Sequence, residues 1–291
     1  MERLTIDDMK EIQLELMDEL DRVCREQGIT YFLAYGSLLG AVRHGGFIPW
    51  DDDMDVVMLR ADYERLIAGF DEWKSSDRFS LAWYRDGKSI YSFVKLVDTT
   101  TRVLENFVDK KTSTGVWVDI FPLEDLKPGD RRPYRKNALL SLVRGFIVAD
   151  PSVGSSAFVK LVKRIVCPFA RRLDALKYAR AIDENARDAN RGERSDVVAD
   201  IVGTENKIVE FPRSLLAPVE MPFEDRVFLA PAGYERFLEL QYGDWRAIPG
   251  DDDREIHTFE AYRLSSRHLP RCETCRPCPP SRTCCGTLRG R

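Results

Sequence analysis

Four aspartates are packed into five residues of this chain, at Asp51, Asp52, Asp53 and Asp55. The apolar residues that follow predict a strand over 53–58. Because side chains alternate across a strand, Asp53 and Asp55 should share one face, with Asp51 beside them. Carboxylates held so close repel one another, and their simplest partner is a divalent cation that prefers oxygen ligands, Mg²⁺ or Mn²⁺. A solvated loop or a calcium site is the alternative, although the run lacks the glycine and glutamate positions of an EF-hand loop.

A glycine-serine turn precedes the aspartates. The apolar segment 29–35 predicts a strand, and Gly36 and Ser37 lead from it into a helix over 37–43. Glycine lets the backbone approach a ligand closely, and the N–H groups at a helix N-terminus favour a phosphate. Such turns are common, so the signal is weak by itself. A phosphate cradle beside a carboxylate cluster is nevertheless the equipment of phosphoryl or nucleotidyl transfer.

Two residues between the turn and the aspartates could also contact a donor. Arg43 is suited to a phosphate because a guanidinium binds one through two hydrogen bonds, and the alternative is an ion pair with Asp51 or Asp52. Trp50 is either a lid over a nucleotide or a packing residue.

Two further charged residues interrupt strands that are otherwise apolar. Lys95 lies in the segment 92–97, and Asp119 is the only charge in the segment 116–121. Burying either group is costly without a partner. Lys95 could bind a donor phosphate or pair with a carboxylate. Asp119 could be a third metal ligand, the base that takes a proton from an acceptor hydroxyl, or a structural turn cap. Pro122 is expected to end the second strand.

The sequence around these residues resembles the LicD family, whose members have a nucleotidyltransferase fold and are related to the fukutin group. The motifs that carry the resemblance are YGSLLGAVRH at 35–44, GFIPWDDDMDV at 46–56, YSFVKLVDTTT at 91–101 and GVWVDIFPL at 115–123, and more weakly YGDW at 242–245. The resemblance covers roughly residues 5–260.

The resemblance implies transfer of a phospho-alcohol, with phosphocholine as the first candidate and ribitol phosphate as a related one, from a CDP-activated donor to a glycan. It implies that Asp53, Asp55 and Asp119 converge as catalytic, metal-binding carboxylates, with Asp51 as a further ligand. An acceptor hydroxyl would attack the distal phosphorus, and CMP would leave. The substrate-binding residues expected on this basis are Gly36, Ser37, Arg43, Trp50, Lys95 and His257. For Lys95 the resemblance favours contact with a donor phosphate. For His257 the alternative is an exposed surface histidine without a role in binding.

Composition is consistent with this chemistry. The 291 residues suffice for one large domain or two small ones. The first residues do not form the apolar segment of a signal peptide, and no run approaches the roughly 18 apolar residues that span a bilayer. Of the seven cysteines, only Cys24 and Cys167 precede residue 265, which favours a reducing compartment. A cytoplasmic protein is therefore expected, with peripheral contact at the inner face of the plasma membrane.

Charge is distributed unevenly along the chain. Residues 131–180 contain twelve lysines and arginines and two aspartates, a net charge of +10, in a protein of net charge −4. Helices are expected over 131–149, 156–180 and 181–194. The second helix combines an apolar face with basic residues. This segment therefore either contacts a membrane surface or a lipid-linked acceptor, or packs in a bundle with a wet basic side.

The other expected elements are helices over 6–27, 60–73 and 234–242 and short strands over 81–84, 197–202 and 227–230. Together the elements predict one α+β domain, residues 1–264, with a nucleotidyltransferase-like mixed β-sheet, flanking helices and a basic helical insertion over 127–195. Residues 265–291, rich in cysteine, proline and arginine, are expected to be disordered rather than to bind zinc.

The expected acceptor is a cell-surface glycan, such as teichoic acid or lipopolysaccharide, or its lipid-linked precursor. Two other functions stay open. A nucleotidyltransferase that uses an NTP would release pyrophosphate in place of CMP. A non-catalytic nucleotide- or RNA-binding module would use the basic segment, but that segment lacks interleaved surface aromatics and the carboxylates would be unexplained, so no nucleic-acid partner is expected.

Overall fold

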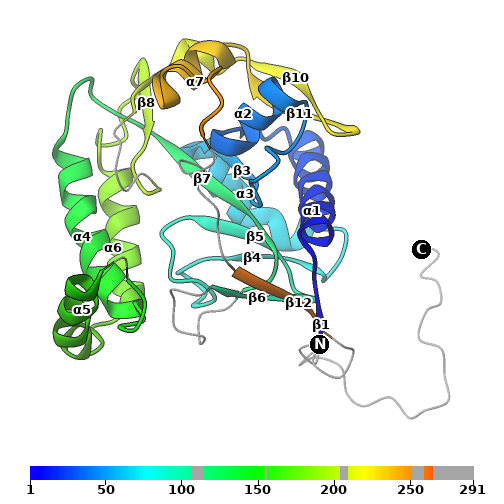
Figure 1. Cartoon of the computed structure of the whole chain (residues 1–291). Coiled ribbons are helices and arrows are strands. Elements are labelled where there is room, and N and C mark those ends of the chain that lie inside the picture. Colours follow the sequence, from blue (N-terminus) through cyan, green and yellow to red (C-terminus); the bar gives the residue numbers. More distant parts are fainter. Residues whose placement is uncertain (106–113, 155, 204–208, 251–258, 265–291) are drawn as a thin grey trace, which may run out of the picture.

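Figure 1 shows the computed structural model of the chain, which describes residues 1–105, 114–154, 156–203, 209–250 and 259–264. The helices are α1 (Ile6–Gln27), α2 (Tyr35–His44), α3 (Arg60–Trp73), α4 (Arg132–Val148), α5 (Ala157–Ala170), α6 (Ala175–Arg187) and α7 (Tyr234–Tyr242), with a 3₁₀ turn, η2, at Arg213–Leu215. The strands are β1 (Glu2–Arg3), β2 (Phe32–Leu33), β3 (Asp55–Leu59), β4 (Phe79–Ala82), β5 (Val94–Asp98), β6 (Thr101–Glu105), β7 (Trp117–Asp125), β8 (Val197–Asp200), β9 (Phe211–Pro212), β10 (Pro218–Phe223), β11 (Arg226–Pro231) and β12 (Phe259–Arg263).

A mixed sheet forms the centre of the fold. Its strand order is β2-β3-β7-β5-β4, and β8 extends it by pairing with both β7 and β9. β3 and β7 run parallel, whereas the other neighbouring strands run antiparallel. Helices α1 and α3 pack on this sheet. The chain is therefore an α+β protein built on a mixed sheet with flanking helices, as the sequence predicted.

Helix α1 follows its sequence signals closely. Thr5 and Asp8 form a capping box, in which the Asp8 N–H donates to the Thr5 hydroxyl at 3.1 Å and the Thr5 N–H donates to the Asp8 carboxylate at 2.8 Å. Gly28 ends the helix in the left-handed conformation, with φ at 59°. Its buried apolar residues include Met9, Ile12, Leu16, Leu20 and Val23, and its bounds agree with the helix predicted over 6–27.

Several strand boundaries differ from the prediction. The strand expected over 29–35 is limited to Phe32–Leu33 because Tyr35 already begins α2, and β3 begins at Asp55, so Asp53 lies in the preceding loop. Pro122 does not end β7, which continues to Asp125. Residues 117–120 of β7 pair with β5 and residues 123–125 pair with β8. Pro122 falls between these two partners, so its missing N–H interrupts neither ladder.

The basic segment folds as three helices. α4 agrees with the prediction, but the single helix expected over 156–180 is divided into α5 and α6, and the polar helix expected over 181–194 is the last part of α6, which ends at Arg187. Asp174 causes the division, since its carboxylate accepts a hydrogen bond of 3.0 Å from the Leu176 N–H and caps α6. Pro168 lies in the last turn of α5.

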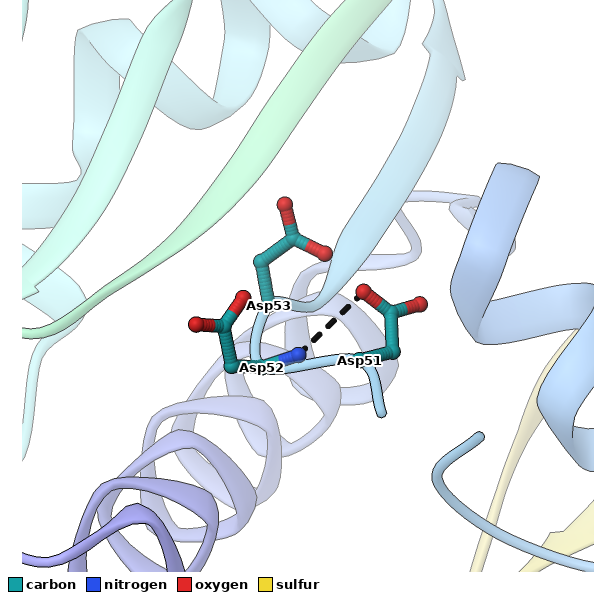
Figure 2. Close-up of side chains that lie close together, drawn as sticks. All are labelled: Asp51, Asp52 and Asp53. Atoms are coloured by element: carbon teal, nitrogen blue, oxygen red, sulfur yellow. Dashed lines mark hydrogen bonds between the residues drawn. The ribbon is translucent and has the colours of Figure 1, made fainter. Parts of the chain in front are cut away.

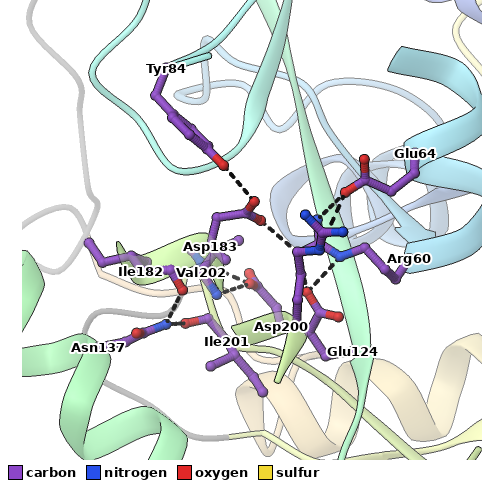
Figure 3. Close-up of polar contacts among 12 residues, drawn as sticks. Arg60, Glu64, Tyr84, Glu124, Asn137, Ile182, Asp183, Asp200, Ile201 and Val202 are labelled. Carbon is purple, nitrogen blue, oxygen red and sulfur yellow. Dashed lines mark hydrogen bonds and ion pairs between the residues drawn. The ribbon is translucent and has the colours of Figure 1, made fainter. Parts of the chain in front are cut away.

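A buried polar network ties these helices to the sheet (Figure 3). The Arg60 guanidinium, at the start of α3, contacts the carboxylates of Glu124 on β7 and, at 2.9 Å, of Asp183 on α6. The Tyr84 hydroxyl donates to Asp183 at 2.7 Å. Because Glu124 and Asp183 are almost fully buried, removing the arginine would take this partner from Glu124, whereas Asp183 would keep its ion pair with Arg85 at 3.1 Å. The network therefore fixes α6 against β7.

Candidate active site

The glycine-serine turn and the aspartate strand are joined by hydrogen bonds. The Ser37 hydroxyl, in the first turn of α2, accepts a hydrogen bond of 2.7 Å from the Asp55 N–H at the start of β3. The Ala34 N–H donates to the Asp55 carbonyl at 3.1 Å. Ser37 is buried, so water does not compete for its hydroxyl. Two motifs that lie apart in the sequence therefore form one structural unit.

Tyr35 introduces strain beside this unit. Its φ is 45°, in the left-handed region that bulky residues rarely adopt. Its hydroxyl donates to Asp200 of β8 at 2.8 Å, and its ring packs edge-on against Phe121 with the centroids 5.5 Å apart. Asp200 is itself held by the N–H groups of Val202 and Gly203. These contacts hold the residue that precedes Gly36 in place.

The register of the sheet brings together charges that are far apart in the sequence. Asp55 of β3 is the partner of Asp119 of β7 in the parallel pair, and Asp119 is the partner of Lys95 of β5 in the antiparallel pair. Neighbouring strands lie about 4.8 Å apart. The three residues therefore form a row across the sheet, in the order acid, acid, base.

Lys95 and Asp119 form a buried ion pair. The Lys95 ammonium lies 3.0 Å from Asp119 Oδ1, and the Trp117 indole N–H donates to Asp119 Oδ2 at 3.2 Å. The ammonium also lies over three aromatic rings, with centroids 3.8 Å away for Trp117, 4.5 Å for Tyr91 and 5.6 Å for Phe93. Burial raises the pKa of Asp119 to about 6, although Lys95 opposes the rise. Of the two partners that the sequence left open for Lys95, the structure shows the carboxylate.

The aspartates before β3 are crowded. Figure 2 shows Asp51, Asp52 and Asp53 side by side, and one carboxylate oxygen from each lies within 4.8 Å of the other two. Among the described residues, this is the group of acidic side chains whose carboxylate oxygens lie close enough together to hold one metal ion. It shares Asp51 and Asp53 with the predicted ligand set and adds Asp52. Burial, followed by the charges of Asp53, Asp119 and Asp51, raises the pKa of Asp55 well above its ordinary value.

A cavity of about 480 Å³ opens beside these aspartates. Its lining residues are Tyr35, Gly36, Leu39, Arg43, Ile48, Trp50, Asp51, Asp53, Asp55, Tyr242, Asp244, Trp245, Ala247 and Pro249. One wall therefore carries carboxylates and the α2 N-terminus, and another carries aromatic rings from the segment after α7. Asp119 and Lys95 are not among the lining residues. Asp119 is next to Asp55 on the neighbouring strand β7, and Lys95 is one strand further, on β5.

The residues that the sequence predicted to bind substrate lie at different positions around the cavity. Gly36 lies so close to the Asp51 carboxylate that a side chain at this position would collide with it. The Arg43 guanidinium donates to the carbonyls of Trp245 and Ala247, both at 3.1 Å. It thereby holds the aromatic wall against α2. His257 lies outside the described residues, and so does the tail over 265–291.

Sequence reasoning did not identify several residues of this site. Trp50 was named, and the structure places its ring in the cavity wall and edge-on to His44. Tyr242, Asp244 and Trp245 were not named, although the weak YGDW motif was the available signal. Tyr35 and Asp200 had no separate signal, because a left-handed tyrosine and its distant acceptor are visible only in three dimensions.

Comparisons with known proteins agree with this geometry. Residues 28–137 match the model of the LicD/FKTN/FKRP nucleotidyltransferase domain. The chain is 25% identical over 279 residues to the lipopolysaccharide cholinephosphotransferase LicD of Haemophilus influenzae, which covers 91% of this chain and 100% of that protein. It is 50% identical over 40 residues to the ribitol 5-phosphate transferase FKRP of Homo sapiens and of Mus musculus, 14% of this chain and 8% of those proteins.

The domain match, which includes the row of Asp55, Asp119 and Lys95, defines the chain as a nucleotidyltransferase-domain protein. Together with the alignment along the full length of LicD, it supports a LicD-family protein, as the sequence resemblance indicated.

Proposed function

We propose that this LicD-family phosphotransferase moves phosphocholine from a CDP-activated donor to a hydroxyl of a cell-surface glycan or of its lipid-linked precursor. Transfer of a phospho-alcohol to a glycan follows from the relatives, one of which is named for cholinephosphate transfer to lipopolysaccharide. The observation that carries the finer proposal is the cavity itself, which joins a carboxylate cluster to a wall of aromatic rings.

The aromatic wall favours choline over an uncharged polyol. Trp50, Tyr242 and Trp245 line the cavity together with the exposed carboxylate of Asp244. A trimethylammonium group is attracted to the faces of aromatic rings and to negative charge, and it needs no hydrogen-bond donors. Ribitol would instead require several polar partners for its hydroxyls. The composition of the wall therefore supports phosphocholine as the transferred group.

The aspartate cluster fits a divalent cation. Asp51, Asp53 and Asp55 line the cavity, and the crowding that raises the pKa of Asp55 is relieved by a positive charge. Carboxylate oxygens at this spacing are the ligands of Mg²⁺ or Mn²⁺. When bound, such an ion would neutralise the negative charge that a donor diphosphate brings into the site.

The chain's own residues orient the reactants. The hydroxyl of Ser37 holds the backbone of Asp55, and the strained Tyr35 presents Gly36 to the cavity. In the proposed reaction the acceptor oxygen bonds to the phosphorus that carries choline, the bond from that phosphorus to the bridging oxygen breaks, and CMP leaves. The hydroxyl proton passes to a carboxylate that lines the cavity or to water.

The test is to incubate the full chain with CDP-choline, Mg²⁺ and a cell-envelope glycan extract and to follow CMP by ³¹P NMR. CMP together with phosphocholine on the glycan is expected, and CDP-ribitol should react at least about tenfold more slowly. Trp245→Leu should reduce this preference, whereas Val227→Leu, on the distant strand β11, should not. Pyrophosphate release from CTP and phosphocholine would instead support the nucleotidyltransferase alternative. RNA binding without Mg²⁺, with neither reaction, would support the binding module.

A further inference from the structure

Helix α5 exposes its largest apolar side chains. The exposed fractions are 72% for Phe158, 55% for Leu161, 59% for Ile165 and 65% for Phe169. Their spacing of three, four and four residues places them in one stripe along the helix. The stripe is about 16 Å long, from the helical rise of about 1.5 Å per residue. Isolated exposed apolar residues are ordinary, but a stripe of this size usually marks an interaction surface.

The opposite face of α5 packs through small residues. Cys167 and Ala170 are its buried residues. Lys160 and Lys163 are only partly exposed. A helix that packs on a protein core normally turns its large apolar residues inward and its charges outward. In α5 the large apolar residues are turned outward. The described part of the chain does not cover this stripe, so we look for another partner that buries it.

The flanks of the stripe are basic. Arg164, Arg171 and Arg172 are exposed, and the Arg172 guanidinium lies 5.6 Å from the centroid of the Phe169 ring. The residues of α5 include no acidic side chain, and residues 131–180 carry a net charge of +10. Figure 1 shows α5 at the outer end of α4 and α6, on the side of the molecule away from α1. The stripe is therefore both prominent and surrounded by positive charge.

We infer that α5 is the surface through which this protein lies on an anionic lipid membrane. The two phenylalanines, Leu161 and Ile165 enter the boundary between head groups and acyl chains, and the arginines contact lipid phosphates. A second copy of the chain is the less suitable occupant, because it would bring the same positive charge to the interface. Among the described residues no helix is long and apolar enough to cross a bilayer. In the proposed contact, α5 lies in the surface of the membrane.

The test is flotation of the full chain with vesicles of phosphatidylglycerol and phosphatidylcholine, compared with pure phosphatidylcholine, at low salt. We expect binding only to the anionic vesicles, and a loss of at least about tenfold in the variant Phe158→Ser/Phe169→Ser. Val227→Ser, which changes an apolar residue with 45% exposure on β11, is the matched control and should bind normally. Arg164→Gln/Arg172→Gln should bind more weakly, with a smaller dependence on salt.

Three results would overturn the inference. They are absence of binding to anionic vesicles, equal binding by the phenylalanine variant, and dimerisation of the wild type, seen by light scattering, that the same variant abolishes. Because the substituted side chains are exposed, the variants should retain the thermal unfolding temperature of the wild type, which separates a lost surface from a lost fold. CMP release from CDP-choline in the presence of a water-soluble acceptor should also be unchanged, so this test is independent of the proposed transfer reaction.

Discussion

Replacing Asp55 by asparagine should stabilise the metal-free protein while it removes the transferase activity. Asp55 lies where the charges of Asp51, Asp53 and Asp119 meet, and burial together with these charges raises its pKa. A like charge one strand spacing away, about 4.8 Å, repels by about 1 kcal/mol in water and by more at a protein surface. We therefore expect the variant to gain about 1–2 kcal/mol at pH 8.

Urea unfolding in the presence of EDTA measures this gain. A carboxyl whose pKa is higher in the folded state holds its proton longer there, so its favourable contribution is complete below the unfolded pKa, 3.8, and is lost as the pH rises through the folded value. The difference between variant and wild type should therefore be small near pH 4 and should grow as the pH rises toward the raised folded pKa of Asp55. Saturating Mn²⁺ should reverse its sign by stabilising the wild type.

Asp244→Asn is the matched control, because Asp244 lines the same cavity but is exposed and lies outside the aspartate cluster. It should change the free energy of unfolding by no more than about 0.5 kcal/mol at any pH. A loss of stability in Asp55→Asn at pH 8, or a difference that does not vary with pH, would refute the electrostatic reasoning.

Substitutions at three other residues test, by urea unfolding and circular dichroism, the contacts that support the site. Ser37→Ala leaves the Asp55 N–H without its acceptor and should cost about 1–3 kcal/mol; a neutral result would contradict the proposed link between α2 and β3. Tyr35→Phe removes one donor to Asp200 and should cost about 1 kcal/mol, and Tyr35→Gly should differ from Tyr35→Ala by relieving the positive φ. Arg60→Met should cost about 3–5 kcal/mol by removing the partner of the buried Glu124 and one of the two arginines that contact Asp183; a cost below about 1 kcal/mol would show that the network does not anchor α6.

Local signals predicted the elements that local interactions determine. The capping box at Thr5 and the left-handed Gly28 are fixed by residues within one helical turn, and α1 was predicted accurately for that reason. The basic segment is divided at Asp174 because the Asp174 carboxylate caps α6. The periodicity of apolar residues does not show where one helix ends and the next begins. Pro122 was expected to end β7, but whether a missing N–H matters depends on which strand lies beside it.

The candidate site was only partly accessible from the sequence for the same reason. Charges in apolar segments, such as Lys95 and Asp119, stand out because their burial demands a partner. The identity of that partner is set by strand register, a long-range property that no local pattern contains. Tyr242 and Trp245 of the aromatic wall lie about 200 residues away from Arg43 in the sequence, and the hydrogen bonds of Arg43 to the carbonyls of Trp245 and Ala247 hold this segment in place.

The central claim is that the aspartates before β3 bind a divalent cation in the cavity. Titration of the full chain with Mn²⁺, followed by the electron paramagnetic resonance signal of the unbound ion, tests it without any assumption about substrates. We predict a stoichiometric site in the wild type that weakens at least about tenfold in Asp53→Asn and is retained in Asp244→Asn. Equal Mn²⁺ binding by the wild type and Asp53→Asn, or none by the wild type with CDP-choline present, would contradict the account.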